Sequence, residues 1–436
     1  MEPKVKDLNL RKTINFEKIN SQIIFLFFTI SSILLSIFFE PKLYPDSQSY
    51  IIMSSARSPG YPFFIFLNKF LFGDFFLKTT IFFQFLFWFY SSYFLVSKIS
   101  RFFNISLFSL LICLFILILP SLHFSDAILT ESISFSFCLI ILGLLIDLIY
   151  RANSKTLILT ILFFILSCLF KPQLLFVFGS LIFVSMFLVF TKKIKQGLLV
   201  TLLAFLSLVV ILNSNKFYHL LNHDSFQIDT NLGSQLIAMP VFMTSKQEIE
   251  NLDNKRNINF LINLHEELDK KKINFNYEKN KETSRQYWIK VYYENYAKFV
   301  DTVNLKVNDF KIIENSNKFL LQLSVDLILL NLSIDAKKFL AGYFYNFSIN
   351  GLYSLYLAFT FLIMTIFFSV FSIYSKSKEM MVISIFFVSH LSNILVVSTI
   401  EPVINRYKFL TEIPLIVLTI ILILNLVFSK TESNDF

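Results

Sequence analysis

The stretch LYPDSQSYIIMSSARSPGYPFF, from Leu43 to Phe64, follows the first long apolar run of the chain. Asp46 stands between a proline and a serine, and Arg57 follows eleven residues later. Two prolines and a glycine at positions 58–62 cannot continue a regular helix. We therefore expect the apolar run to end here, a short helix over 47–56 to lie at the surface, and the 58–62 turn to fold the chain back.

Composition indicates that lipid is the solvent around much of this chain. Of 436 residues, 55% are hydrophobic and only 16% are charged, and the mean hydropathy is +0.64. A soluble domain could not bury that much apolar surface. The net charge of +9 alone is compatible with nucleic-acid binding. However, many lysines and arginines lie in short links between apolar runs, so we expect membrane lipids as partners and no nucleic acid.

Apolar runs of this length predict an all-α polytopic membrane protein with about ten transmembrane helices, because about 20 apolar residues cross a bilayer as a helix. The expected spans are 22–39, 76–97, 104–120, 127–150, 155–170, 173–190, 196–212, 352–374, 379–399 and 411–428. The fifth and sixth meet at Lys171-Pro172, and that pair is also compatible with one broken or re-entrant hairpin.

The distribution of lysine and arginine among the short links predicts the orientation. The larger set, expected in the cytoplasm, is Lys4, Lys6, Arg11, Lys12, Lys18, Lys98, Arg101, Arg151, Lys155, Lys192, Lys193, Lys195, Lys376, Lys378 and Lys430. The smaller set is Lys42, Arg57, Lys69, Lys171, Arg406 and Lys408. Both termini are then cytoplasmic, and the opening stretch faces the periplasm of a bacterial inner membrane.

The predicted organisation has three parts. Residues 1–212 form an N-terminal transmembrane module, 213–351 a mostly helical extracytoplasmic domain, and 352–436 the C-terminal transmembrane helices. The middle part is mostly polar and too long for a plain loop. Within it, residues 319–332 are amphipathic and are expected to lie flat at the membrane interface.

Polar residues at the ends of the spans collect on the predicted outer face. They are Asp46 and Arg57, then His123, Asp126 and Glu131, then Lys171, and finally Glu401, Arg406 and Tyr407. Ionisable groups next to hydrocarbon usually face a cavity or a partner. Both signs of charge on one face indicate a site that handles an anion and also uses a carboxylate.

Each of these residues also has a purely structural interpretation. Asp46 and Asp126 are candidate N-caps, and Glu131 suits the positive end of a helix dipole. Basic side chains at the edge can extend to lipid headgroups; this applies to Arg57, Lys171, Arg406 and Lys408. His123 is compatible with a simple interfacial position, and Glu401, which precedes a proline, with the end of a helix.

Four segments together resemble one family. The segments PDSQSY…ARSPGYPFF, DAILTES, KPQ and RYKFLTEIP resemble, in order and spacing, the GT-C superfamily of polytopic glycosyltransferases. That superfamily includes the protein mannosyltransferases and the bacterial aminoarabinose transferase. The resemblance covers residues 1 to about 212, and about 330 to the end. The first loop reads PDS instead of a paired Asp-Glu, and Lys171-Pro172 replaces a frequent Arg-Pro, which favours the less characterised bacterial members.

The resemblance implies a function and roles for these residues. The enzyme would transfer a sugar, with inversion, from a polyprenyl-phosphate donor to a lipid- or protein-linked acceptor on the outer face. Asp46 would be the general base, and Asp126 or Glu131 would supply the second acidic group. The candidates for binding substrate or its phosphate are Arg57, Lys171, Arg406, Tyr407, Glu401, His123 and Tyr61. A divalent cation, Mg²⁺ or Mn²⁺, would be held by Asp46 and Asp126 if one takes part.

Two other classes of membrane protein remain open. A polysaccharide polymerase or ligase of envelope assembly is also polytopic with a large outer loop, but is expected to depend on basic residues in that loop. A lipid or solute transporter would place charges in the middle of its spans. The acidic first loop and the one-sided charges favour the glycosyltransferase.

Overall fold

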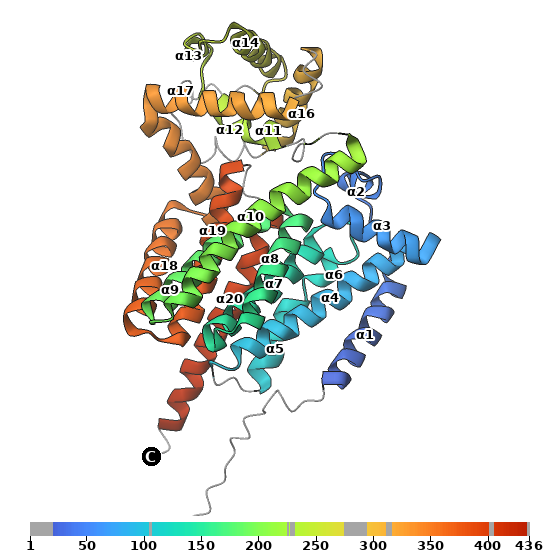
Figure 1. Cartoon of the computed structure of the whole chain (residues 1–436), viewed down its shortest axis with the longest axis vertical. Coiled ribbons are helices and arrows are strands. Elements are labelled where there is room, and N and C mark those ends of the chain that lie inside the picture. The colour runs from blue at the N-terminus through green and yellow to red at the C-terminus, as the bar shows by residue number, and fades with distance from the viewer. Residues whose placement is uncertain are drawn as a thin grey trace, which may run out of the picture.

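The computed structural model is an all-helical molecule, with a large helical bundle and a smaller helical lobe at one end of it (Figure 1). It describes residues 21–103, 107–224, 226, 232–273, 294–310, 316–400 and 405–433, and no β-strand occurs among them. The bundle contains α1 (Ser21–Phe38), α3 (Gly60–Phe72), α4 (Phe76–Ile99), α5 (Leu107–Ile118), α7 (Glu131–Arg151), α8 (Ser154–Phe170), α9 (Val177–Phe190), α10 (Ile194–His223), α18 (Leu355–Ser375), α19 (Lys378–Ile400) and α20 (Asn405–Ser433).

The helical, polytopic class is confirmed, but the count of ten spans is not. In the described part of the chain, eight helical segments are long and apolar enough to cross a membrane. They are Gly60–Ile99, Glu131–Arg151, Pro172–Phe190, Ile194–His223, Ser316–Lys337, Leu355–Ser375, Lys378–Ile400 and Arg406–Asn425. Three predicted spans, 22–39, 104–120 and 155–170, coincide instead with shorter apolar helices.

Helix α7 is the centre of the bundle. Its sequence, ESISFSFCLIILGLLIDLIYR, is apolar on every side, which is typical of a helix enclosed by other helices. It packs against α4, α8, α9, α19 and α20, and its most apolar 18-residue window is 94% buried. Because α7 begins at Glu131, this helix brings the predicted acidic residue to the end of the bundle nearest the lobe.

Helix α10 is longer than the predicted span 196–212 and continues to His223. The predicted boundary between the first two parts, after residue 212, therefore cuts a continuous helix. The segment beyond residue 212, NSNKFYHLLNH, is polar in composition, so hydropathy alone predicts that the span ends before it. Residues Ile211, Asn215 and His219 are nevertheless buried at helical spacing, so this segment packs on the protein along one face.

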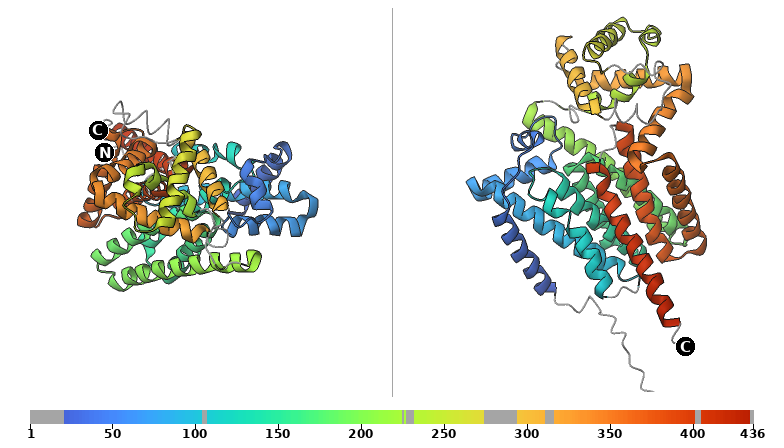
Figure 2. Two further views of the ribbon diagram at one scale, coloured as in Figure 1. Left: turned by 90° about the horizontal axis from the view of Figure 1, so that it is seen from above. Right: turned by 180° about the vertical axis from the view of Figure 1, so that it is seen from behind.

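The lobe consists of α11 (Leu232–Leu236), α12 (Ala238–Met243), α13 (Lys246–Ile249), α14 (Lys255–Lys270), α16 (Glu294–Asp309) and α17 (Ser316–Tyr345). It has its own apolar core, to which α17 contributes Leu320, Leu323 and Leu327. Helix α17 lies across the end of the bundle instead of running along it (Figures 1 and 2). It covers the amphipathic stretch 319–332 and kinks at Asp335. Although α17 is apolar enough to count as a span, it belongs to the lobe, and the position of 319–332 at the membrane interface stays a prediction.

Two loops at the lobe end of the bundle are joined by backbone and side-chain contacts. Lys42 and Ala127 form an isolated parallel bridge, and the Lys42 ammonium lies 2.7 Å from the buried carboxylate of Asp126. Close by, the amide nitrogen of Gln84 donates to the carbonyl oxygens of Ser125 and Ala127. These contacts connect the first loop, the second loop and α4.

Gly60 allows the first turn of α3 to touch the last turn of α8. A Cβ atom at position 60 would lie 2.7 Å from the backbone nitrogen of Phe170 and 2.8 Å from the carbonyl carbon of Leu169. Side-chain rotation cannot relieve a clash with backbone. This close approach places the turn after Arg57 directly against the segment that leads into Lys171.

Replacing Gly60 by alanine should therefore lower the free energy of unfolding by about 1–3 kcal/mol, the usual cost of overpacking a tight contact. Thermal unfolding in detergent would measure the change. Ser58→Ala, two residues away, adds no volume and is the matched control. Equal stability of Gly60→Ala and the wild type would show that α3 and α8 are not held in this contact.

Candidate functional site

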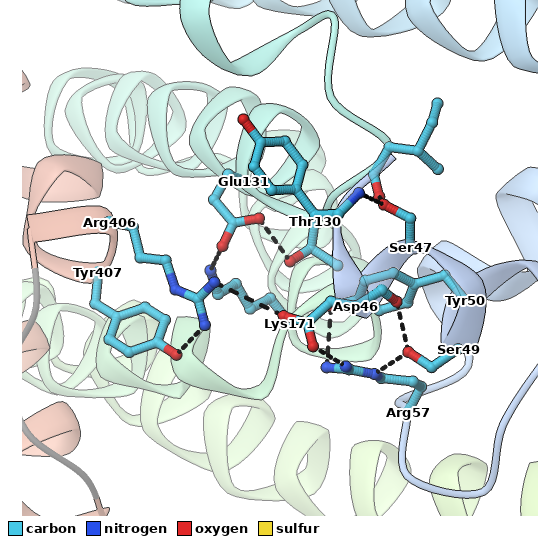
Figure 3. Close-up of polar contacts among 12 residues, drawn as sticks. Asp46, Ser47, Ser49, Tyr50, Arg57, Thr130, Glu131, Lys171, Arg406 and Tyr407 are labelled. Carbon is cyan, nitrogen blue, oxygen red and sulfur yellow. Dashed lines mark hydrogen bonds and ion pairs between the residues drawn. The ribbon is translucent and has the colours of Figure 1, made fainter. Parts of the chain in front are cut away.

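The predicted polar residues meet at the end of the bundle beneath the lobe, where α2 (Pro45–Ile51), α7, α8 and α20 converge (Figures 1 and 3). Figure 3 shows two carboxylates, Asp46 and Glu131, surrounded by three cations, Arg57, Lys171 and Arg406. We refer to these five residues as the charged cluster. They come from four segments that are distant in sequence.

Asp46 does not cap α2, so the N-cap interpretation is wrong. The helix begins at Pro45, one residue before Asp46, and Ser47 Oγ accepts the hydrogen bond from the Tyr44 N–H. Asp46 lies in the first turn of α2, and its carboxylate points toward two arginines. Its Oδ1 is 2.6 Å from Arg57 Nη2, and its Oδ2 is 3.7 Å from Arg406 Nη1.

Arg57 is fixed by several partners besides Asp46. Its Nε donates to Ser49 Oγ at 2.7 Å, and its guanidinium lies over the ring of Tyr50, 4.5 Å from the centroid. Ser49 in turn donates to the Asp46 carbonyl. Burial raises the pKa of Tyr50 to about 12, so its phenol remains a proton donor at physiological pH. The short helix and the turn after it thus form one hydrogen-bonded unit.

Glu131 and Lys171 form the buried half of the charged cluster. Lys171 Nζ is 3.1 Å from Glu131 Oε1, and the two side chains are only 11% and 5% exposed. Thr130 Oγ1 lies 3.5 Å from the other carboxylate oxygen. Lys171 has extended backbone between α8 and the 3-10 turn η3 (Pro172–Phe176). The predicted break at Lys171-Pro172 is present, and it places this buried lysine at the bundle end.

Arg406 and Tyr407 enter the site from the first turn of α20. Arg406 Nη2 donates to the Tyr407 hydroxyl at 2.9 Å, while Nη1 faces Asp46. The ring of Tyr407 also lies beneath the Lys171 ammonium, 5.0 Å from its centroid. Tyr407 therefore contacts two of the three cations, and α20 closes the cluster opposite α2.

A hydrogen-bonded amide network positions the segments that carry Lys171 and Arg406. Asn393 on α19 is fully buried, and its nitrogen donates to the Tyr407 carbonyl and to Thr411 Oγ1, each at 3.0 Å. Gln173 donates to Asn393 Oδ1 at 2.7 Å and to the Tyr407 carbonyl at 2.8 Å. His390 completes the network through Thr411. The network joins η3 to α20 behind the charged side chains.

Replacing Asn393 by leucine should lower the free energy of unfolding by about 1–3 kcal/mol, because the buried groups of Gln173 and Tyr407 then lose a partner. Thermal unfolding in detergent measures this loss. Asn68→Leu is the control, since within the described residues the buried Asn68 side chain bonds only to the Phe64 carbonyl of its own helix. Equal effects of the two substitutions would contradict a bridging role for Asn393.

Three predicted site residues lie outside the charged cluster, and one is not described. Asp126 is fully buried and pairs with Lys42, a contact that raises the pKa of the Lys42 ammonium. It does not cap α7, which begins at Glu131 after Thr130. Tyr61 is fully buried and donates to Gln84, and His123 is exposed with its ring against Phe124. Glu401 lies outside the described residues.

The two carboxylates predicted to hold a divalent cation pair with different basic side chains. Asp46 faces Arg57 and Arg406, whereas Asp126 faces Lys42, so the two carboxylates share no partner. In the described ranges, no three His, Cys, Asp or Glu side chains are grouped to hold a metal ion. The donor set here suits an anion better than a cation.

Sequence reasoning missed several residues of the site. Tyr50 and Gln173 lie close in sequence to charged residues of the site, but their neutral side chains give no signal of a role in it. Asn393 could have been predicted as a hydrogen-bonding residue, since an amide inside an apolar span needs a partner. Thr411 and Ser49 have no such signal, because hydroxyls are common at helix ends and in turns.

The bundle also contains an apolar cavity of about 400 Å³. Its walls come from α1, α3, α4, α7 and α8. The lining residues are Phe25, Phe64, Phe83, Leu86, Phe87, Tyr90, Ile133, Phe137 and Phe170. Phe170 immediately precedes Lys171, and Ile133 is two residues after Glu131. The cavity lining therefore includes residues close in sequence to both members of the buried ion pair.

No family model, curated protein or solved structure matches this chain.

Proposed function

We propose that this protein is a membrane glycosyltransferase that moves a sugar from a polyprenyl-phosphate donor to an acceptor on the outer face of a bacterial inner membrane. The observation that carries the proposal is Asp46, a partly exposed carboxylate held between Arg57 and Arg406. In this proposal Asp46 supplies a base and the two arginines supply an anion site.

The three cations support binding of a phosphate. Arg57, Lys171 and Arg406 come from separate segments and converge on two carboxylates, which leaves one positive charge in excess. Guanidinium groups bind phosphate oxygens through paired, charge-assisted hydrogen bonds. Arg57 and Arg406 are 23% and 41% exposed, so an incoming anion can reach them, whereas Lys171 is more deeply buried.

The apolar cavity supports a donor with a hydrocarbon tail. Its lining offers aromatic and aliphatic surface, which suits an isoprenoid chain and not a sugar. Since Phe170 adjoins Lys171, a chain in this cavity would have its phosphate near the charged cluster. This arrangement favours a lipid-linked donor over a water-soluble nucleotide sugar.

The proposed chemistry is a single displacement. The acceptor oxygen (or nitrogen) attacks the anomeric carbon, Asp46 takes its proton, and the bond to the phosphate oxygen breaks with inversion. Polyprenyl phosphate leaves as an anion, so no acid is needed to protonate it. Donor phosphate would compete with Asp46 for Arg57 and Arg406, which would release the carboxylate to act as a base.

Between the two candidates for the second acidic group, the geometry favours Glu131. It belongs to the charged cluster through Lys171, whereas Asp126 is committed to the loop bridge with Lys42. In this proposal Glu131 keeps Lys171 in place and accepts hydrogen bonds from sugar hydroxyls. No step is assigned to a metal ion, because the residues expected to bind one face cations.

The orientation rests on the lysine and arginine distribution, and it puts the charged cluster and the lobe outside. The lobe lies above the bundle end that carries the cluster (Figure 2). An acceptor that approaches from the periplasm would pass beside it. We therefore propose that the lobe selects the lipid- or protein-linked acceptor.

Purified protein, reconstituted with defined polyprenyl-phosphate sugars and an envelope extract as acceptor, tests the proposal. We expect transfer from at least one monophosphate donor. Failure with all such donors, together with activity on pyrophosphate-linked oligosaccharides, would instead indicate a polymerase or ligase. Protein-dependent flux of lipid or solute without any transfer would indicate a transporter.

A further inference from the structure

The end of α10 carries two histidines that the charged cluster does not use. His219 and His223 are four positions apart on the helix, and their ring centroids lie 5.7 Å apart. His219 is fully buried, and within the described part of the chain neither of its ring nitrogens has a hydrogen-bond partner. The buried Nε2 of His223 likewise has none there.

Such an arrangement is unusual for structural histidines. A neutral imidazole carries one N–H donor and one acceptor nitrogen, and buried polar groups in proteins nearly always find a partner. By contrast, His390 in the bundle core bonds to Thr411. The two α10 rings also lie next to each other, so the three nitrogens that lack a partner within the described ranges belong to adjacent rings.

We propose that His219 and His223 bind a transition-metal ion of the Zn²⁺ class. Histidines four residues apart on one helix face project in the same direction and can coordinate one ion, as in the HExxH arrangement. Imidazole nitrogen suits Zn²⁺, Cu²⁺ or Ni²⁺, whereas Mg²⁺ and Ca²⁺ require oxygen ligands. Two protein ligands leave the remaining coordination positions for water or a bound anion.

The site would connect α10 to the loop that precedes α3. Tyr218, adjacent to His219, has its hydroxyl 3.5 Å from the carbonyl of Met53. Met53 has a positive φ of 54°, a conformation that is unfavourable for a non-glycine residue, so this turn needs support from its surroundings. A metal ion on the two histidines would rigidify the helix end that packs on this turn.

Metal titration of the full chain in detergent, after chelator treatment, tests the site. Isothermal titration with Zn²⁺ should show one bound equivalent in the wild type. His219→Gln and His223→Gln should each weaken binding by at least about tenfold, since even residues around metal ligands affect affinity that strongly. His123→Gln, which changes an exposed histidine elsewhere, should bind as the wild type does.

Thermal unfolding provides a second readout. Zn²⁺ should raise the unfolding temperature of the wild type, because a ligand that binds only the folded state stabilises it. The rise should vanish in His223→Gln, whose partly exposed position makes a folding failure less of a concern than at His219. Absence of a bound equivalent in the wild type, or undiminished binding in His223→Gln, would overturn the proposal whether or not glycosyl transfer is found.

Discussion

Replacing Asp46 by asparagine should lower sugar transfer by about 10²- to 10⁴-fold, the usual contribution of a positioned general base. Asparagine has nearly the same shape, and its Oδ1 can still accept from Arg57. The fold and the first loop should therefore survive, while the ability to take a proton is lost. Transfer from the donor identified with wild-type protein, under saturating donor and acceptor, measures the effect.

Asp74→Asn is the matched control for this experiment. Asp74 is an exposed acid in the turn between α3 and α4, and it contributes to no contact of the charged cluster. Its replacement changes the net charge equally and should leave transfer unaffected. Full activity of Asp46→Asn would remove Asp46 as the base and restrict it to holding Arg57 and Arg406.

Replacing Lys171 by methionine should destabilise the protein by about 3–5 kcal/mol. Glu131 is then left without its cationic partner at a site where its side chain is 5% exposed, and an unpaired buried carboxylate is costly. Methionine retains most of the lysine volume, so the loss reports on charge and not on packing. Unfolding in mixed detergent micelles would provide the free energies.

A second substitution separates the charge effect from any packing defect. Glu131→Gln in the Lys171→Met background removes the orphaned charge and should recover much of the lost stability. Lys78→Met is the control, because Lys78 pairs with the exposed Glu40 and should cost no more than about 1 kcal/mol. If the double variant is no more stable than Lys171→Met, the ion pair is not the source of the effect.

The helical framework could be predicted from sequence because lipid imposes a strict rule on the backbone. A long apolar stretch can satisfy its own hydrogen bonds only as a helix, and the predicted spans accordingly coincide with helices. The rule does not predict helix ends that pack against protein. The predicted span 196–212 is part of a helix that continues to His223, because polar residues beyond 212, such as Asn215, are buried against other parts of the protein.

The sequence predicts which residues belong to the charged cluster better than it predicts how they are arranged. Charges at one side of a bundle restrict the candidates, so Asp46, Arg57, Lys171 and Arg406 were found without any contact information. Which acid joins them was not decided by sequence, because Asp126 and Glu131 stand only five positions apart. The bridge between Lys42 and Ala127 decides it, and such pairing between loops has no local sequence signal.

The charged cluster combines residues that are far apart along the chain, and this affects biosynthesis. Asp46 and Arg57 are translated well before Arg406, which lies in α20. Until α20 joins the bundle, Asp46 can pair with Arg57 but lacks its contact with Arg406. If the cluster binds the phosphate of a donor, as we propose, that binding site would be completed only after α20 has been inserted.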